Sequence, residues 1–157
     1  AGGETAVVAA ARERQWMMVR RLADARADLE ATGRGSPKTV TMMAAEVLQW
    51  ETLEHLAIRR ANLNDHGKDG KTVLMYAAEC GQERLVQILL KCRAWAEAKD
   101  DRGDTALLRA CNRQLEGTMR ILWEGGAKID DAVKHSRIPS MGRLLREWSG
   151  DDTEEVF

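Results

Sequence analysis

The residues of this sequence that could bind a metal ion or carry catalysis are its histidines and a group of aspartates. The three histidines are far apart in the chain: His55, His66 and His135. None has the four-residue spacing that would place two imidazoles on one face of a helix to bind zinc. A short segment contains three aspartates, Asp100, Asp101 and Asp104. It lacks the twelve-residue pattern of a calcium-binding EF-hand. The sequence therefore predicts a protein that is not an enzyme, with no metal and no other cofactor.

The cysteines and the charge balance limit the compartment and the kind of partner. The chain has an odd number of cysteines, Cys80, Cys92 and Cys111. Because they lack the C-x-x-C spacing of zinc and redox sites, we expect reduced thiols in an intracellular, reducing compartment, either the cytosol or an organelle. The 24 Lys and Arg nearly balance the 25 Asp and Glu, so the net charge favours neither nucleic acid nor an anionic membrane surface. No apolar run approaches the ~18 residues of a membrane span, so we expect no direct membrane insertion. Because the first residue is Ala1 rather than Met, we expect a processed protein or a fragment of a longer one.

The elements that must position any functional residue repeat along the chain. A nine-residue segment occurs four times, as GKTVLMYAA, GDTALLRAC, PKTVTMMAA and GETAVVAAA, beginning at Gly70, Gly103, Pro37 and Gly3. Its threonines are separated by 34, 33 and 33 residues: Thr5, Thr39, Thr72 and Thr105. A second set of positions keeps the same register: Ala27, Ala61, Ala94 and Ala127. Two independent sets in one register predict four repeated units.

Each unit is predicted to contain two short helices. The threonine can cap the first helix by accepting hydrogen bonds from its free N–H groups. In the third unit the apolar residues share one face of each helix: Leu74, Ala77 and Ala78 on the first, and Val86, Leu89 and Leu90 on the second. Gly81 lies between the two helices and allows the chain to fold back antiparallel. The two small alanines allow helices of neighbouring units to approach closely, so we expect the units to stack.

The repeated unit resembles the ankyrin repeat, a family whose T-P-L-H-x-A motif is matched by TVLMYAA at Thr72 and less closely by TALLRAC at Thr105. The resemblance implies an all-α ankyrin-repeat solenoid, in which antiparallel helix pairs stack and hairpin-like finger loops join each pair to the next. We expect a single ankyrin-repeat domain over residues 1–148 and an acidic tail at 149–157. Within the domain we expect units at about 3–35, 36–68, 69–101 and 102–130, and a shortened capping repeat at 131–148. The cap should bury apolar residues that keep a helical spacing: Ala132, Val133, Met141, Leu144 and Leu145.

The units depart from the family motif at three positions. The family's proline after the threonine is replaced in all four units, by Ala6, Val40, Val73 and Ala106. Apolar residues replace the family's histidine: Val8, Met42, Met75 and Leu108. We therefore expect the stack to be stabilised more by packing than by a polar ladder. The glycine between the helices is present only as Gly81; the other units have Arg14, Leu48 and Gln114 in its place. Because a left-handed conformation costs a non-glycine residue on the order of 1 kcal/mol, we expect these three loops to differ from the standard one.

The resemblance also implies that the chain binds another protein, on a concave face made by the finger loops and the exposed side of the first helices. Carried over position by position, the candidate binding residues on this face are Lys38, Glu46, Lys68, Lys71, Tyr76, Glu79, Arg102, Asp104, Arg109 and Arg113. The same face would include Val47, Asp69, Asp101 and Asn112. The alternative for each of these residues is an ordinary solvated position without a partner.

Trp16 and Trp50 form a second candidate surface, since they occupy the same position at the start of the second helix in adjacent units. Glutamates stand at this position in the next two units, which indicates exposure. Large aromatics often dominate the energetics of interfaces. The alternative is that the two rings stack on each other or on Met17 and Arg20. Trp123 is expected to lie in the core.

Two functions remain open from the sequence. The first is a non-catalytic adaptor or scaffold that binds a partner through the concave face. The alternative is a structural or assembly subunit embedded in a larger multiprotein complex. The identity of the partner does not follow from any motif in the chain.

Overall fold

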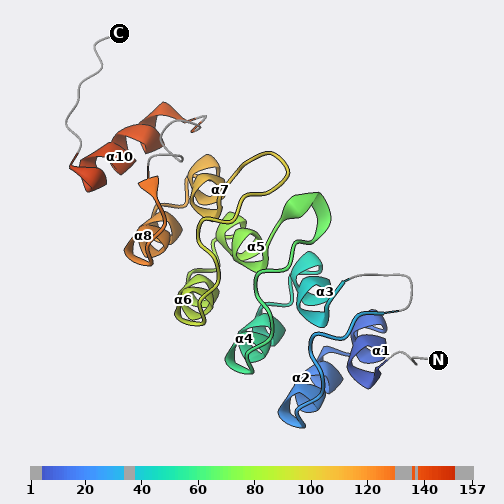
Figure 1. The fold of residues 1–157 in the computed structure, drawn as a ribbon. Helices are drawn as coiled ribbons and strands as arrows, with labels where there is room; N and C mark the ends of the chain where they lie inside the picture. Colours follow the sequence, from blue (N-terminus) through green and yellow to red (C-terminus); the bar gives the residue numbers. More distant parts are fainter. Residues whose placement is uncertain (1–4, 34–37, 130–135, 137, 151–157) are drawn as a thin grey trace.

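The computed structural model describes residues 5–33, 38–129, 136 and 138–150, and these residues form a row of antiparallel helix pairs (Figure 1). The pairs are α1 (Ala6–Arg12) with α2 (Trp16–Asp24), α3 (Val40–Glu46) with α4 (Trp50–Ile58), α5 (Val73–Glu79) with α6 (Glu83–Lys91), and α7 (Ala106–Asn112) with α8 (Glu116–Glu124). A short 3-10 helix, η1 (Lys68–Gly70), precedes α5, and α10 (Pro139–Ser149) ends the row.

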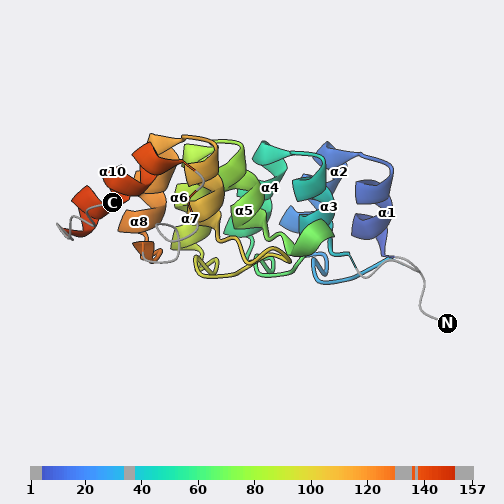
Figure 2. The ribbon, with the colours of Figure 1, turned by 90° about the horizontal axis from the view of Figure 1, so that it is seen from above.

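The helix pairs stack in register, so that equivalent helices form two rows. Each first helix packs on the next one, from α1 through α3 and α5 to α7, and each second helix does the same, from α2 through α4 and α6 to α8. Figure 2 shows the loops that lead into α5 and α7 projecting to the same side of the stack, as expected for finger loops. The predicted all-α repeat solenoid is confirmed.

The core of the third unit contains most of the residues that the helical spacing predicts. Leu74, Ala77 and Ala78 are fully buried between neighbouring first helices. Val86 and Leu89 are equally buried on α6. Leu90 is only half-buried, because it lies over Gly125 of the next unit at the surface of the stack; a Cβ atom on that glycine would lie 2.5 Å from a Leu90 methyl carbon.

Threonine caps begin three of the four first helices. The Oγ1 atoms of Thr39, Thr72 and Thr105 accept hydrogen bonds from the backbone N–H groups three residues later, at 3.4, 3.4 and 3.3 Å respectively. The Thr5 side chain makes no such bond. In the third unit the Met75 sulfur also accepts a hydrogen bond from the Thr72 N–H at 3.4 Å. A methionine at the family's histidine position therefore keeps part of the polar cap while its side chain is buried.

A ladder of hydrogen bonds from backbone N–H groups to side chains joins successive units, in the segments that follow the second helices. Glu30 accepts from the N–H of Asn62 at 2.8 Å, and Glu97 accepts from the N–H of Lys128 at 2.8 Å. Asn64 makes the equivalent bond to the Trp95 N–H at 2.9 Å. Each acceptor lies three residues after the repeated alanine of its unit. Packing is thus supplemented by polar contacts that we did not predict.

The loops between the paired helices contradict our expectation for the units without a glycine. Arg14, Leu48 and Gln114 adopt φ angles of 57°, 59° and 59°, close to the 67° of Gly81. In every unit the residue that follows donates its N–H to the carbonyl five residues earlier, at distances from 2.8 to 3.1 Å. The prediction of different loops is wrong, because this hydrogen bond and the packing of both helices hold the same turn despite the cost of a left-handed side chain.

The last described helix covers the end of the row. Leu145 is fully buried, and Met141, Leu144 and Trp148 pack against the core. The Trp148 ring stacks on Trp123 of α8, with ring centroids 5.5 Å apart. Trp123 is therefore half-buried beneath the last helix rather than enclosed in the core. The candidate cap residues Ala132 and Val133 and most of the acidic tail lie outside the described residues, and α10 itself continues to Ser149.

Candidate protein-interaction site

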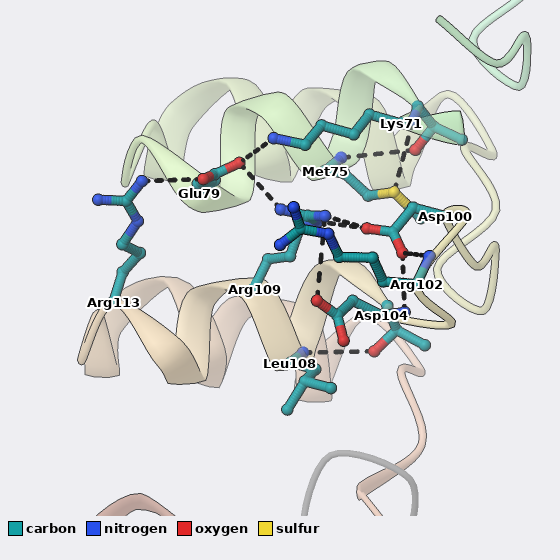
Figure 3. Close-up of polar contacts among 11 residues, drawn as sticks. Lys71, Met75, Glu79, Asp100, Arg102, Asp104, Leu108, Arg109 and Arg113 are labelled. Carbon is teal, nitrogen blue, oxygen red and sulfur yellow. Dashed lines mark hydrogen bonds and ion pairs between the residues drawn. The ribbon is translucent and has the colours of Figure 1, made fainter. Parts of the chain in front are cut away.

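Apart from Trp16 and Trp50, the predicted binding residues lie on one side of the stack, which we call the inner face: the accessible residues of α3, α5 and α7 and of the described loops before these helices. Within it, the structure brings together the charged residues of the third and fourth units (Figure 3). In the second unit, Lys38 and Glu46 form a separate ion pair, in which the ammonium lies 2.7 Å from both carboxylate oxygens. Val47 and Asn112 are half-buried at the edges of this surface.

Glu79 is the centre of the charged cluster. One of its carboxylate oxygens accepts from Lys71 Nζ at 2.7 Å and from Arg109 Nη1 at 3.3 Å, and the other accepts from Arg113 Nη2 at 2.9 Å. Burial alone would raise the pKa of Glu79, but the hydrogen bonds from Lys71 and Arg113 and the nearby positive charges lower it to about 2. The carboxylate is therefore ionised at neutral pH and holds three basic side chains in place.

Arg109 lies under the finger loop before α7 rather than on an exposed helix face. Its side chain is only 10% exposed, and its Nε atom donates to Asp100 Oδ2 at 2.7 Å, with Nη2 directed at the same oxygen. The predicted exposure of Arg109 is wrong, because its guanidinium pairs with the buried Asp100 carboxylate, and a buried charge needs a paired, hydrogen-bonded partner. Arg109 is a structural residue that joins the loop to α7.

Asp100 also organises the backbone of the same loop. Its other oxygen, Oδ1, accepts from the N–H of Arg102 at 2.8 Å and from the N–H of Asp104 at 2.9 Å. Burial raises the pKa of Asp100, but the hydrogen bonds from Arg109 and from the two backbone groups outweigh this effect and lower it. The candidate residue Asp104 is half-buried, with its carboxylate 3.9 Å from Arg109.

Tyr76 is the aromatic residue of the inner face and occupies the position that Arg109 has in the next unit. It is half-buried, and Lys71 Nζ lies 5.4 Å from the centre of its ring. Burial is the main cause that raises the pKa of Tyr76, and the carboxylates of Glu46, Asp69 and Glu79 add to it. The phenol is therefore neutral at physiological pH and can donate a hydrogen bond.

The tips of the two complete finger loops are exposed and contact each other. Lys68 and Arg102 are exposed at these tips. The Asp101 N–H donates to the Asp69 carbonyl at 3.1 Å. A Cβ atom on Gly70 would lie 2.4 Å from a carboxylate oxygen of Asp101, so only glycine allows this approach. The tips therefore present their charges from a fixed backbone.

Trp16 and Trp50 are each half-buried against the core, and their positions lie between the two predicted alternatives. Both line a hollow of about 310 Å³ that also contains Arg20 and Glu51, an ion pair at 2.9 Å. Among the described residues, the stacked ring pair is Trp123 with Trp148. Trp16 and Trp50 therefore do not stack on each other. Neither the Trp16 ring nor the Trp50 ring is fully exposed.

Of the residues first considered for catalysis, His55 and Asp100 have structural partners. His55 lies 2.9 Å from Asp24, which also pairs with Arg59, and this cluster links α2 to α4. Within the described ranges, no three His, Cys, Asp or Glu side chains lie close enough to hold a metal ion. Burial raises the pKa of the Cys80 and Cys111 thiols, which makes both poor nucleophiles. In the part of the chain that the structure describes, no helix has the length and apolar content needed to cross a membrane.

These features define a helical-repeat protein with stacked helix pairs, projecting loops and a charged inner face. The family model for ankyrin repeats, which contains three copies of the repeat, matches residues 41–132. This range is more than half of the chain. The chain therefore belongs to the ankyrin-repeat family, whose repeats are generally modules for protein–protein interaction and are typically not catalytic. A comparison with curated proteins found no match.

Two groups of residues were not recognised in the sequence as contacts. One feature of the sequence could have indicated the pairing of Asp100 with Arg109. The third unit has Gly67 and Tyr76 at the equivalent positions, so both residues change together between the two units. The ladder residues Glu30, Asn64 and Glu97 share their offset from the repeated alanine, which a comparison of the aligned units could have found.

Proposed function

We propose that the chain is a non-catalytic adaptor or scaffold that binds a partner protein through its inner face. The observation that carries this proposal is the arrangement around Tyr76, a half-buried aromatic ring flanked by Lys71 and by the Glu79 cluster. Tyrosine and arginine are enriched at the energetic centres of interfaces. The ion pairs hold these side chains before a partner arrives, which lowers the entropy lost on binding.

The charged side chains of the inner face that are exposed to solvent are of both signs and suit a partner of mixed charge. Arg113 is 61% exposed although it contacts Glu79, and Lys68, Asp69, Asp101 and Arg102 are exposed at the finger tips. Both signs alternate over this surface, so a partner segment with both acidic and basic residues would complement it.

The test is capture of partners from a cell extract with the tagged chain, followed by mass spectrometry and measurement of the affinity of each purified partner. Lys68→Glu with Arg102→Glu should weaken binding, and Tyr76→Ala should weaken it by about 2 kcal/mol. Lys71 and Arg113 are unsuitable for charge reversal, because new carboxylates would face Glu79 and destabilise the fold.

The matched control for charge is Lys91→Glu with Arg143→Glu, since both residues are exposed and lie outside the inner face, on α6 and α10. This control should leave the affinity unchanged. Equal binding by the control, the finger variant and the Tyr76 variant would rule out the inner face as the contact surface.

A second candidate function is a structural subunit embedded in a larger assembly. Its support is a set of large apolar side chains exposed outside the inner face: Met17, Ile58 and Trp95, with 69%, 65% and 63% of their surface accessible. An embedded subunit would use several surfaces at once. It predicts that capture is lost both with the inner-face variants and with Ile58→Ser or Trp95→Ser, whereas an adaptor predicts loss with the inner-face variants alone.

We further propose that the protein works in an intracellular, reducing compartment. The support is that all three cysteines are free thiols, with Cys80 and Cys92 exposed and Cys111 buried. Exposed thiols are exceptional in oxidising compartments, where they form disulfides. Detection of a tagged chain in a secretory compartment, with these thiols oxidised, would contradict this proposal.

A further inference from the structure

The first unit has a stacking surface that no other helix of the described row covers. Each later second helix packs against the second helix before it: α4 on α2, α6 on α4 and α8 on α6. Figure 1 shows α1 and α2 at one end of the described row and α10 at the other. The side of α2 that corresponds to the covered side of α4, α6 and α8 therefore faces away from the stack.

The residues on this side of α2 are apolar and exposed. The four second helices have equal lengths, so their positions can be compared directly. The third position is buried in the three later units, as Thr52, Leu85 and Thr118. In α2 the same position is Met18, which is 42% exposed, and the second position is Met17, which is more exposed still. At the third position the first unit thus exposes an apolar side chain where each later unit is buried, and Met17 adds an apolar side chain at the second position, which is exposed in the later units too.

The ion pairs between stacked helices show which charges this surface accepts. Glu51, at the second position of α4, pairs with Arg20 of α2 at 2.9 Å. His55, at the sixth position of α4, lies 2.9 Å from Asp24 of α2. The sixth position of α2 is Arg21, so the equivalent contact on this side of α2 would be a carboxylate on the covering helix.

A hollow of about 430 Å³ marks the same surface. Its lining residues are Arg14, Gln15, Trp16, Met17, Met18 and Arg21. The lining contains two guanidinium groups and no carboxylate. Exposed methionines are flexible and polarisable, which suits a surface that adapts to apolar side chains of a partner.

We propose that this surface, the α2 face, made by Arg14, Trp16, Met17, Met18 and Arg21, binds an amphipathic helix of a partner protein. The helix lies along α2 as α2 lies along α4, with its apolar side on the two methionines. Its acidic residues face the two arginines. The continuity of the α2 face with the stacking surface of the later units and the charge of the hollow both select this occupant.

The test uses two synthetic peptides held helical by a hydrocarbon staple and labelled with a fluorophore. The first has leucines at helical spacing flanked by glutamates, and the second has lysines in place of the glutamates. Fluorescence anisotropy with the full chain should show binding of the glutamate peptide at least about tenfold tighter than the lysine peptide. Arg21→Glu should reverse this preference, and Met17→Ser with Met18→Ser should weaken both peptides by about tenfold or more.

Arg143→Glu is the matched control, because Arg143 is also an exposed arginine on a helix but lies on α10. Arg143→Glu should not alter the affinity for either peptide. The finger variant Lys68→Glu with Arg102→Glu should not alter it either, and this result would distinguish binding at the α2 face from binding at the inner face. Thermal melts should show that each variant is folded. Absence of binding at peptide concentrations of about 1 mM, or a preference unchanged by Arg21→Glu, would overturn the proposal. Sedimentation would also overturn it if the chain self-associates and the methionine variant is monomeric, because a second copy would then occupy the α2 face.

Discussion

At the scale of single residues, the inner face combines ion pairs of two kinds. Lys38 with Glu46 is accessible to solvent, and pairs of this kind contribute little to stability. Asp100 with Arg109 is buried, and its two charges depend on each other because neither is well solvated. The first kind holds two partly exposed side chains at the surface, whereas the second holds a finger loop against its helix.

The buried pair leads to a prediction that uses the third unit as a template. Arg109→Tyr leaves the Asp100 carboxylate buried without its cation and should lower the free energy of unfolding by about 3 to 5 kcal/mol. Adding Asp100→Gly reproduces the Gly67 and Tyr76 combination of the third unit and should recover part of this loss, because it removes the unpaired carboxylate but also the oxygen that accepts from the Arg102 and Asp104 N–H groups. Urea unfolding followed by circular dichroism measures both changes. A double variant no more stable than the single one would show that the carboxylate is not the source of the cost.

Glu79 should make the stability depend on pH in the acid range. Its pKa in the folded protein is about 2, against 4.5 for an ordinary glutamate. A carboxyl group with a lowered pKa stabilises the fold fully above its unfolded pKa and loses this contribution as the pH falls toward the folded value. The wild-type chain should therefore lose up to about 3 kcal/mol from this group between neutral pH and pH 2.

The check is urea unfolding of the wild type and of Glu79→Gln over this pH range. The variant should be less stable at neutral pH, and the difference from the wild type should shrink as the pH falls. Glu124→Gln, which removes an exposed carboxyl at the end of α8, is the control and should follow the wild type. A constant difference between wild type and Glu79→Gln at all pH values would contradict the assigned ion pairs.

At the scale of helices and loops, much of the architecture could be predicted because it depends on local chemistry. The threonine caps follow from one hydroxyl and the N–H groups next to it, and the burial of Leu74, Ala77 and Ala78 follows from helical spacing. The loop geometry at Leu48 could not be predicted, because its residue type opposes the conformation that the packing of both helices imposes. The burial of Arg109 could not be predicted either, because its partner Asp100 lies in a loop nine residues earlier, and helical periodicity does not relate the two positions.

The left-handed loop residues predict a gain in stability on substitution by glycine. Leu48→Gly should raise the free energy of unfolding by about 1 kcal/mol, because glycine adopts a φ of 59° without the steric cost paid by leucine. The neighbouring Gln49 has a φ of −84°, so Gln49→Gly has no strain to relieve and should lower stability by about 0.5 to 1 kcal/mol. Equal effects of the two substitutions in thermal melts would show that Leu48 is not strained.

At the scale of the whole molecule, the units are stable because each covers the apolar side of the next. The two ends of the described row differ in how this requirement is met. At one end α10 buries Leu145 and stacks Trp148 on Trp123, while at the other Met17 and Met18 remain exposed. This difference was only partly visible in the sequence: the apolar spacing of the cap predicted a covering helix, but the exposure of the methionines required the register of stacked helices.

The covering role of α10 gives a final prediction. Removing residues 131–157 should expose the apolar side of α8, where Met119 and Leu122 are fully buried in the intact chain. Because an exposed apolar patch of this kind promotes association, the shortened chain should form oligomers or aggregate. Removing only residues 151–157 is the control, since the helix already ends at Gly150 in a left-handed conformation that closes it. The control should keep the melting temperature and the sedimentation coefficient of the intact chain apart from the loss of mass. If the chain without residues 131–157 is as stable and as monomeric as the control, α10 does not protect the stack, and the stacking of Trp148 on Trp123 contributes no more than a surface contact.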